Sequence, residues 1–170
     1  MENSNFLTAD ALTSHAESTS SVLNYILLDL LLPSASTASS SAQITALSHG
    51  LSHLGTAATV ANLLRALPFH AAKGRMVIPA DITSKHGVIQ ENVFRYAQGN
   101  VREETTNPEK VLKDRKALEE AVYELATLAN DHVQTAKTTV YEEFNGKIPA
   151  RVLPVFLSGV RHSFGFANFS

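Results

Sequence analysis

Apolar residues recur every three or four positions along most of the chain, which is the period of helices that bury one face. The first such stretch covers residues 17–32, and Pro33 ends it because proline does not continue a helix. Its apolar face consists of Val22, Leu23, Ile26, Leu27 and Leu30. The pattern predicts one amphipathic helix, followed by a linker rich in serine and alanine over residues 33–41.

A second apolar stripe predicts a helix over residues 42–66. The small residues in its second half are Gly55, Ala57, Ala58 and Ala61. They let a neighbouring helix approach closely. We expect the helix to end before Pro68, because the residue preceding a proline avoids the helical region of backbone space. A loop over residues 69–81 would follow.

The longest periodic stretch covers residues 108–141, with apolar positions three and four apart, as in the seam of a helical bundle. Shorter helices are predicted over residues 82–86, 90–97 and 150–160. Extended structure is predicted, at most, over residues 76–78. These elements together indicate an all-α fold.

The length of 170 residues suits a single domain. No internal repeat divides the chain. We expect a disordered start over residues 1–16, one helical domain over residues 17–160 and an irregular tail over residues 161–170.

Charge is unevenly spread along the chain, although the net charge is only −2. All 14 lysines and arginines lie at or after Arg65. Charges of both signs are interleaved beyond that point, which is typical of solvated helix faces. The small net charge argues against a protein that binds nucleic acid.

The chain contains no cysteine, which excludes disulfides, thiol catalysis and cysteine-bound zinc. Its longest apolar run, over residues 25–32, is much shorter than the about 20 residues of a membrane-spanning helix. Secretory and mitochondrial signals need early basic residues, and none occurs before Arg65. For an organelle protein this predicts a natural start upstream of Met1.

Several short motifs follow one another between Leu51 and Arg95. They consist of Asn62, Leu63, Leu64 and Arg65 at the end of a helix, Gly74, Arg75 and Pro79 in a loop, and then Asp81, Gly87 and Glu91. In order and spacing these residues resemble the squalene/phytoene synthase family. The resemblance covers residues 17–160. It implies a partial version of that family's terpenoid-synthase-like helical bundle.

Further motifs overlap this segment. They are Ser52-His53-Leu54-Gly55, the run from Leu64 to His70 with Pro68 inside it, Ile78 to Ile82, and His86 to Glu91. They are similar to one branch of the family, the complex I assembly factor 6-like proteins of mitochondria. That branch implies a non-catalytic factor at the matrix side of the inner membrane, with peripheral contact to that membrane. Its implied partners are complex I subunits or other assembly factors.

The positions that carry catalysis in this family depart from its pattern. Active members hold magnesium ions against a substrate diphosphate with two Asp-rich motifs, since such ions need carboxylate ligands. Ala66 and His70 stand at the second motif, and the first would lie upstream of Glu17. We therefore expect no catalytic residue and no cofactor. Two alternatives stay open: a prenyl transferase whose magnesium is held by other residues, and a truncated fragment without function.

Basic residues gather around the predicted loop, at Arg65, Lys73, Arg75 and Lys85. One interpretation is a remnant site for phosphate or anionic lipid on Arg65, Lys73 and Arg75, because guanidinium groups bind phosphate through paired hydrogen bonds. The other is ordinary helix-end chemistry, in which cations are favoured near a helix C-terminus.

The candidate ligands or bases include His49, His53, His70 and His86. His49 and His53 lie four positions apart, a spacing that can hold zinc, but no third ligand is evident nearby. We expect a structural or exposed pair and no metal site. His70 and His86 stand singly at turns and are expected to be hydrogen-bonded loop residues rather than general bases.

Two surfaces remain to be assigned. The acidic residues of the third long helix, among them Asp114, Glu120 and Glu124, are expected to form a solvated face. The first two helices are the most apolar and the least charged. In a partial version of a larger fold we expect one of them to carry an exposed apolar patch, as a partner site or an aggregation liability.

Overall fold

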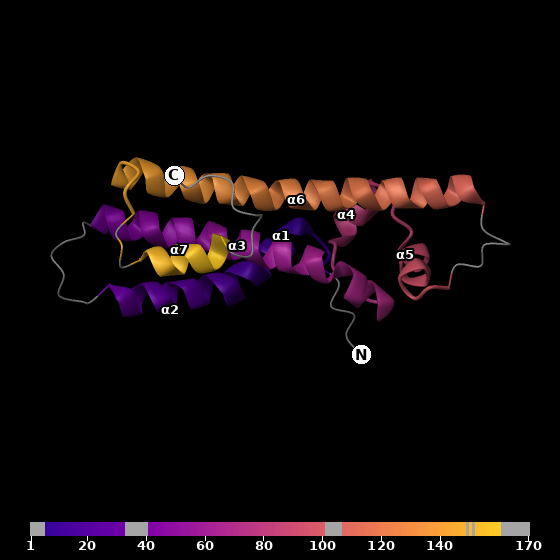
Figure 1. The fold of residues 1–170 in the computed structure, drawn as a ribbon, viewed down its shortest axis with the longest axis horizontal. Coiled ribbons are helices and arrows are strands. Elements are labelled where there is room, and N and C mark those ends of the chain that lie inside the picture. Colours follow the sequence, from indigo (N-terminus) through magenta and orange to yellow (C-terminus); the bar gives the residue numbers. More distant parts are fainter. Residues whose placement is uncertain (1–5, 33–40, 101–106, 149, 151, 161–170) are drawn as a thin grey trace. The chain divides into compact units, whose positions relative to one another are not determined.

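The computed structural model describes residues 6–32, 41–100, 107–148, 150 and 152–160, and most of them are helical (Figure 1). No strand is present among these residues, so the predicted all-α class is confirmed. None of the described helices has the length and apolarity that a membrane crossing requires. The backbone divides into two compact units, each made of two separate stretches of sequence.

Unit 1 consists of Met1–Thr13 and Asn62–Thr127. It holds the start of α1 (Ala9–Ala16), the end of α3 (Ser41–Ala72), all of α4 (Ala80–Lys85) and α5 (Gln90–Ala97), and the first part of α6 (Pro108–Phe144). Its buried apolar side chains are Leu12, Leu67, Ala71, Met76, Val77, Ile78, Ile82, Val93, Ala121 and Leu125.

Unit 2 consists of Ser14–Ala61 and Leu128–Ser170. It holds the end of α1, the π-helical turn η1 (Glu17–Ser21), α2 (Val22–Leu31), most of α3, the end of α6, and α7 (Leu153–Val160). One cluster of its core consists of Leu28, Leu47, Leu51, Leu54, Ala136, Val140, Val152, Val155 and Phe156. Within this unit α7 lies alongside α2 (Figure 1).

The first helical stretch begins earlier than the sequence pattern predicted. α1, η1 and α2 follow one another without a break, so it starts at Ala9. Leu12 and Ala16 are fully buried, and the Thr8 hydroxyl accepts the N–H of Ala11 in the first turn. The expected disordered start is therefore wrong for residues 9–16. Residues 1–5, residues 33–40 of the predicted linker and the tail over residues 161–170 lie outside the described residues. Ser41, the last residue of the predicted linker, begins α3.

Helix α3 runs through Pro68 and ends at Ala72, so the expectation that this proline ends the helix is wrong. A proline in a helix interior removes one backbone hydrogen bond and crowds the preceding turn, at a cost of about 3 kcal/mol. Leu67 and Ala71 on either side of it are buried. Their packing offsets the local cost, which is why the helix continues.

The other helices agree with the periodicity. The short helices predicted over residues 82–86 and 90–97 are α4 and α5, and the longest predicted helix is α6. The segment considered for extended structure, Met76–Ile78, forms no strand; its side chains are buried instead.

Candidate functional site

Helix α2 directs polar side chains towards α3. Ser21, immediately before α2, is fully buried, and its hydroxyl donates to the carbonyl of Ser52 at 3.0 Å. The Asn24 amide donates to the carbonyl of Leu51, also at 3.0 Å. A contact of this kind satisfies its polar groups but contributes little hydrophobic stabilisation.

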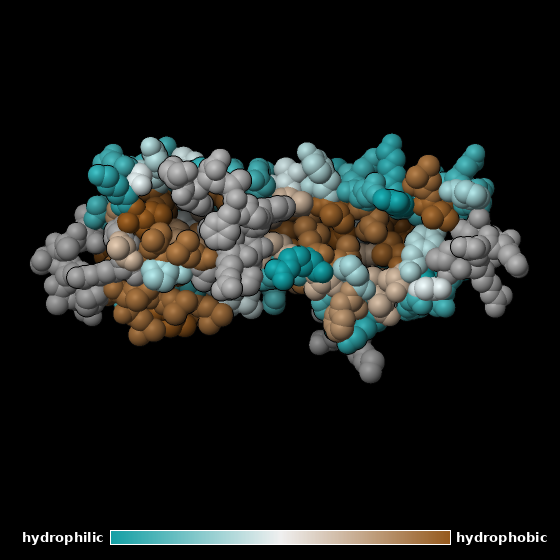
Figure 2. Space-filling view, viewed as in Figure 1, coloured by the Kyte–Doolittle hydropathy of each residue, from teal (hydrophilic) through white to brown (hydrophobic). Residues whose placement is uncertain are grey.

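The opposite side of α2 is apolar and exposed, and it forms a hydrophobic patch in Figure 2. Its five side chains are Val22, Leu23, Ile26, Leu27 and Leu30, of which Leu23 and Leu30 are 63% and 76% exposed. Leu153 and Leu157 of the neighbouring α7 are exposed as well. We call these seven residues the apolar face. The patch expected on one of the first two helices therefore lies on the first.

Glu17 belongs to the polar side of this helical stretch. Its carboxylate accepts hydrogen bonds from the hydroxyls of Tyr25 and Ser52, each at 2.5 Å. Burial raises the pKa of Glu17, but the hydrogen bonds from Ser52 and Tyr25 outweigh it, and the pKa lies below its ordinary value. Glu17 is thus held as a carboxylate that fastens η1 to α3.

Three histidines of unit 2 form a row. The Nε2 atoms of His53 and His49 are 3.0 Å apart, and the Nδ1 atoms of His53 and His132 are 2.7 Å apart. Burial and the neighbouring imidazoles lower the pKa of His53, and burial lowers that of His132. Sequence reasoning found the pair on α3 but missed His132, which comes from α6 at a separation of 79 positions.

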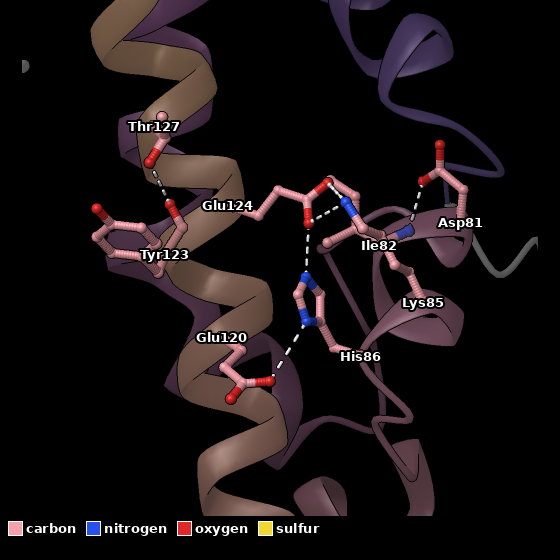
Figure 3. Close-up of polar contacts among 8 residues, drawn as sticks. All are labelled: Asp81, Ile82, Lys85, His86, Glu120, Tyr123, Glu124 and Thr127. Carbon is pink, nitrogen blue, oxygen red and sulfur yellow. Dashed lines mark hydrogen bonds and ion pairs between the residues drawn. The ribbon is translucent and has the colours of Figure 1, made fainter.

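In unit 1, His86 lies between two glutamates of α6 (Figure 3). Its Nε2 is 2.6 Å from a carboxylate oxygen of Glu124, and its Nδ1 is 3.5 Å from one of Glu120. Lys85 also binds Glu124, at 2.9 Å, and the hydrogen bonds from Lys85 and His86 lower the pKa of Glu124. His86 is confirmed as a hydrogen-bonded loop residue, whereas Glu124 is an anchor between α4 and α6 rather than part of a plain solvated face.

Asp114 also departs from the expected solvated face, because its side chain is buried. It accepts hydrogen bonds from the Asn92 amide at 2.8 Å and the Tyr96 hydroxyl at 3.0 Å. Burial and the bond to Asp114 raise the pKa of Tyr96. Asp114 also lines a pocket of about 270 Å³ together with His86, Lys110 and Lys113.

The basic residues around the loop have different surroundings. Lys85 is paired with Glu124, and the ammonium of Lys73 lies 4.0 Å from the centre of the Phe69 ring. Arg65 and Arg75 are exposed. The anion site on Arg65, Lys73 and Arg75 stays a prediction.

Several residues of the sequence motifs bind backbone groups or adopt special backbone conformations. The Asp81 carboxylate accepts the N–H of Ala9 at 3.0 Å and that of Ile82 at 2.7 Å, and so ties the start of α1 to α4. Pro79 is buried directly before α4. Gly74 and Gly87 have φ angles of +69° and +68°, which an L side chain rarely adopts.

The remaining motif positions lie on α3. Asn62 and Pro68 are exposed, while Ala66 and His70 are half-buried. Neither Ala66 nor His70 carries a carboxylate. Among the described residues, no group of three or more histidine or acidic side chains is arranged to hold a metal ion.

A family model described as squalene/phytoene synthase matches residues 1–160. NADH dehydrogenase (ubiquinone) complex I, assembly factor 6, is 29% identical over 149 residues in Rattus norvegicus and 31% over 150 residues in Bos taurus. Each alignment covers 88% of this chain and 36% of the relative.

The homolog from Dictyostelium discoideum is 33% identical over 110 residues, which is 65% of this chain and 25% of that protein. The chain therefore spans about a third, or less, of the length of these curated relatives. No solved structure matches the chain.

Proposed function

Because the chain belongs to the squalene/phytoene synthase family and matches curated complex I assembly factors, we propose that it helps to assemble mitochondrial respiratory complex I. It acts by contact with other proteins rather than by catalysis. Its place of action is the matrix side of the inner membrane. Its partners are complex I subunits or other assembly factors.

The apolar face carries this proposal. Exposed apolar patches of this kind mark protein interaction sites. Val22, Ile26 and Leu30 form one row four positions apart, and Leu23 and Leu27 form the next. Ridges with this spacing fit the grooves of another helix. The occupant we propose is a helix that presents its own apolar side, supplied by a protein of the assembly.

Charge favours a protein over a lipid surface as the occupant. Helices that lie on membranes carry lysines and arginines around their apolar side, and anionic lipids attract such residues. No lysine or arginine occurs before Arg65, and the charged residue of α2 is Asp29. The α2 part of the apolar face therefore lacks the cations that would hold it to an anionic bilayer.

The residues at the motif positions support a role without prenyl transfer. A departing diphosphate must be neutralised, and magnesium held by carboxylates performs this task in such chemistry. Ala66 and His70 provide no carboxylate for it. The phosphate site on Arg65, Lys73 and Arg75 would at most bind an anion without transferring a prenyl group.

Complementation tests the proposal. In cells that lack the endogenous factor, wild type should restore complex I on native gels, whereas Leu23→Glu/Leu30→Glu should not. Leu112→Glu is the matched control, since Leu112 is 67% exposed but lies on α6 in unit 1. Wild type should also form cross-links to complex I subunits or assembly factors. The Leu23→Glu/Leu30→Glu variant should lose these cross-links together with its ability to restore complex I.

Three outcomes would overturn parts of this proposal. Full restoration of complex I by Leu23→Glu/Leu30→Glu would show that the apolar face is not needed for function. Flotation of wild type, but not of this variant, with phosphatidylcholine and cardiolipin vesicles would make a membrane the occupant. Magnesium-dependent turnover of a prenyl diphosphate by the purified chain would restore the enzyme alternative.

A further inference from the structure

We propose that His49 and His53 bind one divalent ion of the copper or nickel type through their Nε2 atoms, with His132 as the residue that positions His53. All three histidines belong to unit 2. His49 is exposed, so an ion can reach the pair from solvent. The site is independent of the proposed assembly function.

The spacing of the two nitrogens is compatible with one shared ion of the copper or nickel type. Imidazole nitrogens bind such metals at about 2.0–2.1 Å. Two Nε2 atoms 3.0 Å apart therefore subtend an angle of about 91–97° at a shared ion. This is close to the right angle of square-planar or tetragonal sites, which are typical of Cu²⁺ and Ni²⁺.

His132 supplies the outer hydrogen bond that metal-binding histidines usually have. Its Nδ1 lies 2.7 Å from the Nδ1 of His53 and is therefore the acceptor when His53 donates from that nitrogen. This tautomer of His53 leaves the Nε2 lone pair free for a metal. His132 is not a third ligand, because it faces the other ring nitrogen.

The same tautomers explain why His49 and His53 are hydrogen-bonded to each other when no metal is bound. His53 then accepts, at Nε2, the N–H that His49 donates from its own Nε2. When a metal binds, this proton leaves His49 Nε2 for solvent and His49 takes up another at Nδ1. The hydrogen bond between His53 and His132 is kept.

The surroundings favour neutral rings and leave ligand positions open. Glu17 is the acidic group that acts on His53, and Asp131 acts on His132. Burial nevertheless lowers the pKa of His53 and of His132, so both of these rings favour the neutral form. Since the described residues offer no group of three ligands around one point, water completes the coordination.

Titration of the purified chain with NiCl2, followed by calorimetry, tests the site. Wild type should bind about one ion, and copper electron paramagnetic resonance should show coupling to two nitrogens. His49→Ala should weaken nickel binding about 100-fold or more, and His132→Ala about 10- to 100-fold. His15→Ala is the control, since His15 is an exposed histidine of the same unit, and it should bind as wild type.

His49→Ala is the decisive variant because His49 is exposed and its loss should leave the thermal melt unchanged. Unchanged nickel affinity in a folded His49→Ala would overturn the proposal. So would an equal loss of affinity in His15→Ala, which would identify scattered surface binding. Wild-type affinity in His132→Ala would remove His132 from the site.

Discussion

Gly55 and Ser21 lie so close together that a Cβ atom on Gly55 would be 2.6 Å from the Ser21 hydroxyl oxygen and 2.9 Å from its backbone nitrogen. The π-helical turn η1 therefore approaches α3 at backbone distance. Gly55 is one of the family-motif positions, and this contact gives a physical reason for a glycine there. The absence of a side chain at Gly55 lets η1 and α3 touch.

Replacement of this glycine should reverse the usual effect of the substitution. In an unobstructed helix, Gly→Ala stabilises a protein by about 1 kcal/mol. Gly55→Ala should instead lower the free energy of unfolding by about 1–3 kcal/mol, because the Ser21 backbone cannot yield as a side chain would. Urea denaturation measures the difference. A gain in stability would show that η1 does not lie against α3.

The histidine row should make the protein sensitive to mild acid. The pKa values of His53 and His132 are lowered below the ordinary 6.5, so the unfolded chain binds protons that the folded chain refuses. Stability should be full above pH 6.5 and should fall as the pH drops below that value. Thermal melts from pH 7.5 to 5 test this expectation. His53→Gln/His132→Gln should flatten the dependence, and an unchanged slope would contradict it.

Two neighbouring leucines of α2 should respond very differently to truncation. Leu28 is 2% exposed within the core of unit 2, whereas Leu30 is 76% exposed. Leu28→Ala should cost about 2–5 kcal/mol of unfolding free energy. Leu30→Ala should change it by no more than about 0.5 kcal/mol. Chemical denaturation of both variants checks the orientation of α2, which equal losses would refute.

Glu124 should contribute more to stability than an ordinary surface glutamate. It accepts hydrogen bonds from both Lys85 and His86, whereas Glu119 pairs with Arg115 on an exposed helix face. Glu124→Gln should therefore lower the free energy of unfolding by about 1 kcal/mol. Glu119→Gln should lower it by about 0.3–0.5 kcal/mol. Urea denaturation at low salt compares them, and equal losses would count against the cluster.

The sequence predicted the helices that packing and local preference both favour. The periodicity located α4, α5 and α6, because their apolar positions coincide with their buried faces. It failed at Pro68, where local preference opposes the helix and the burial of Leu67 and Ala71 decides the outcome. It also missed α1, whose short sequence has a single large apolar side chain, Leu12, but buries Leu12 and Ala16 completely.

The candidate sites were less accessible to sequence reasoning. The spacing of His49 and His53 is a local property of a helix, so it could be read from the chain. The approach of His132 depends on how α3 and α6 pack, and no local pattern encodes it. The apolar face was anticipated from composition. Its direction was not, because it depends on the polar contacts of Ser21 and Asn24 with α3.

The interleaving of the two units has a consequence for biosynthesis. Unit 1 joins residues near the start of the chain to residues up to Thr127, and unit 2 joins the next stretch to residues after Leu128. The bond between Ala9 and Asp81 alone closes a separation of 72 positions. On the ribosome, α2 must therefore emerge long before α7 can lie beside it. Until then Leu28 lacks the later members of its core cluster, Val152, Val155 and Phe156. We expect a chaperone that covers Leu28 to assist the nascent chain.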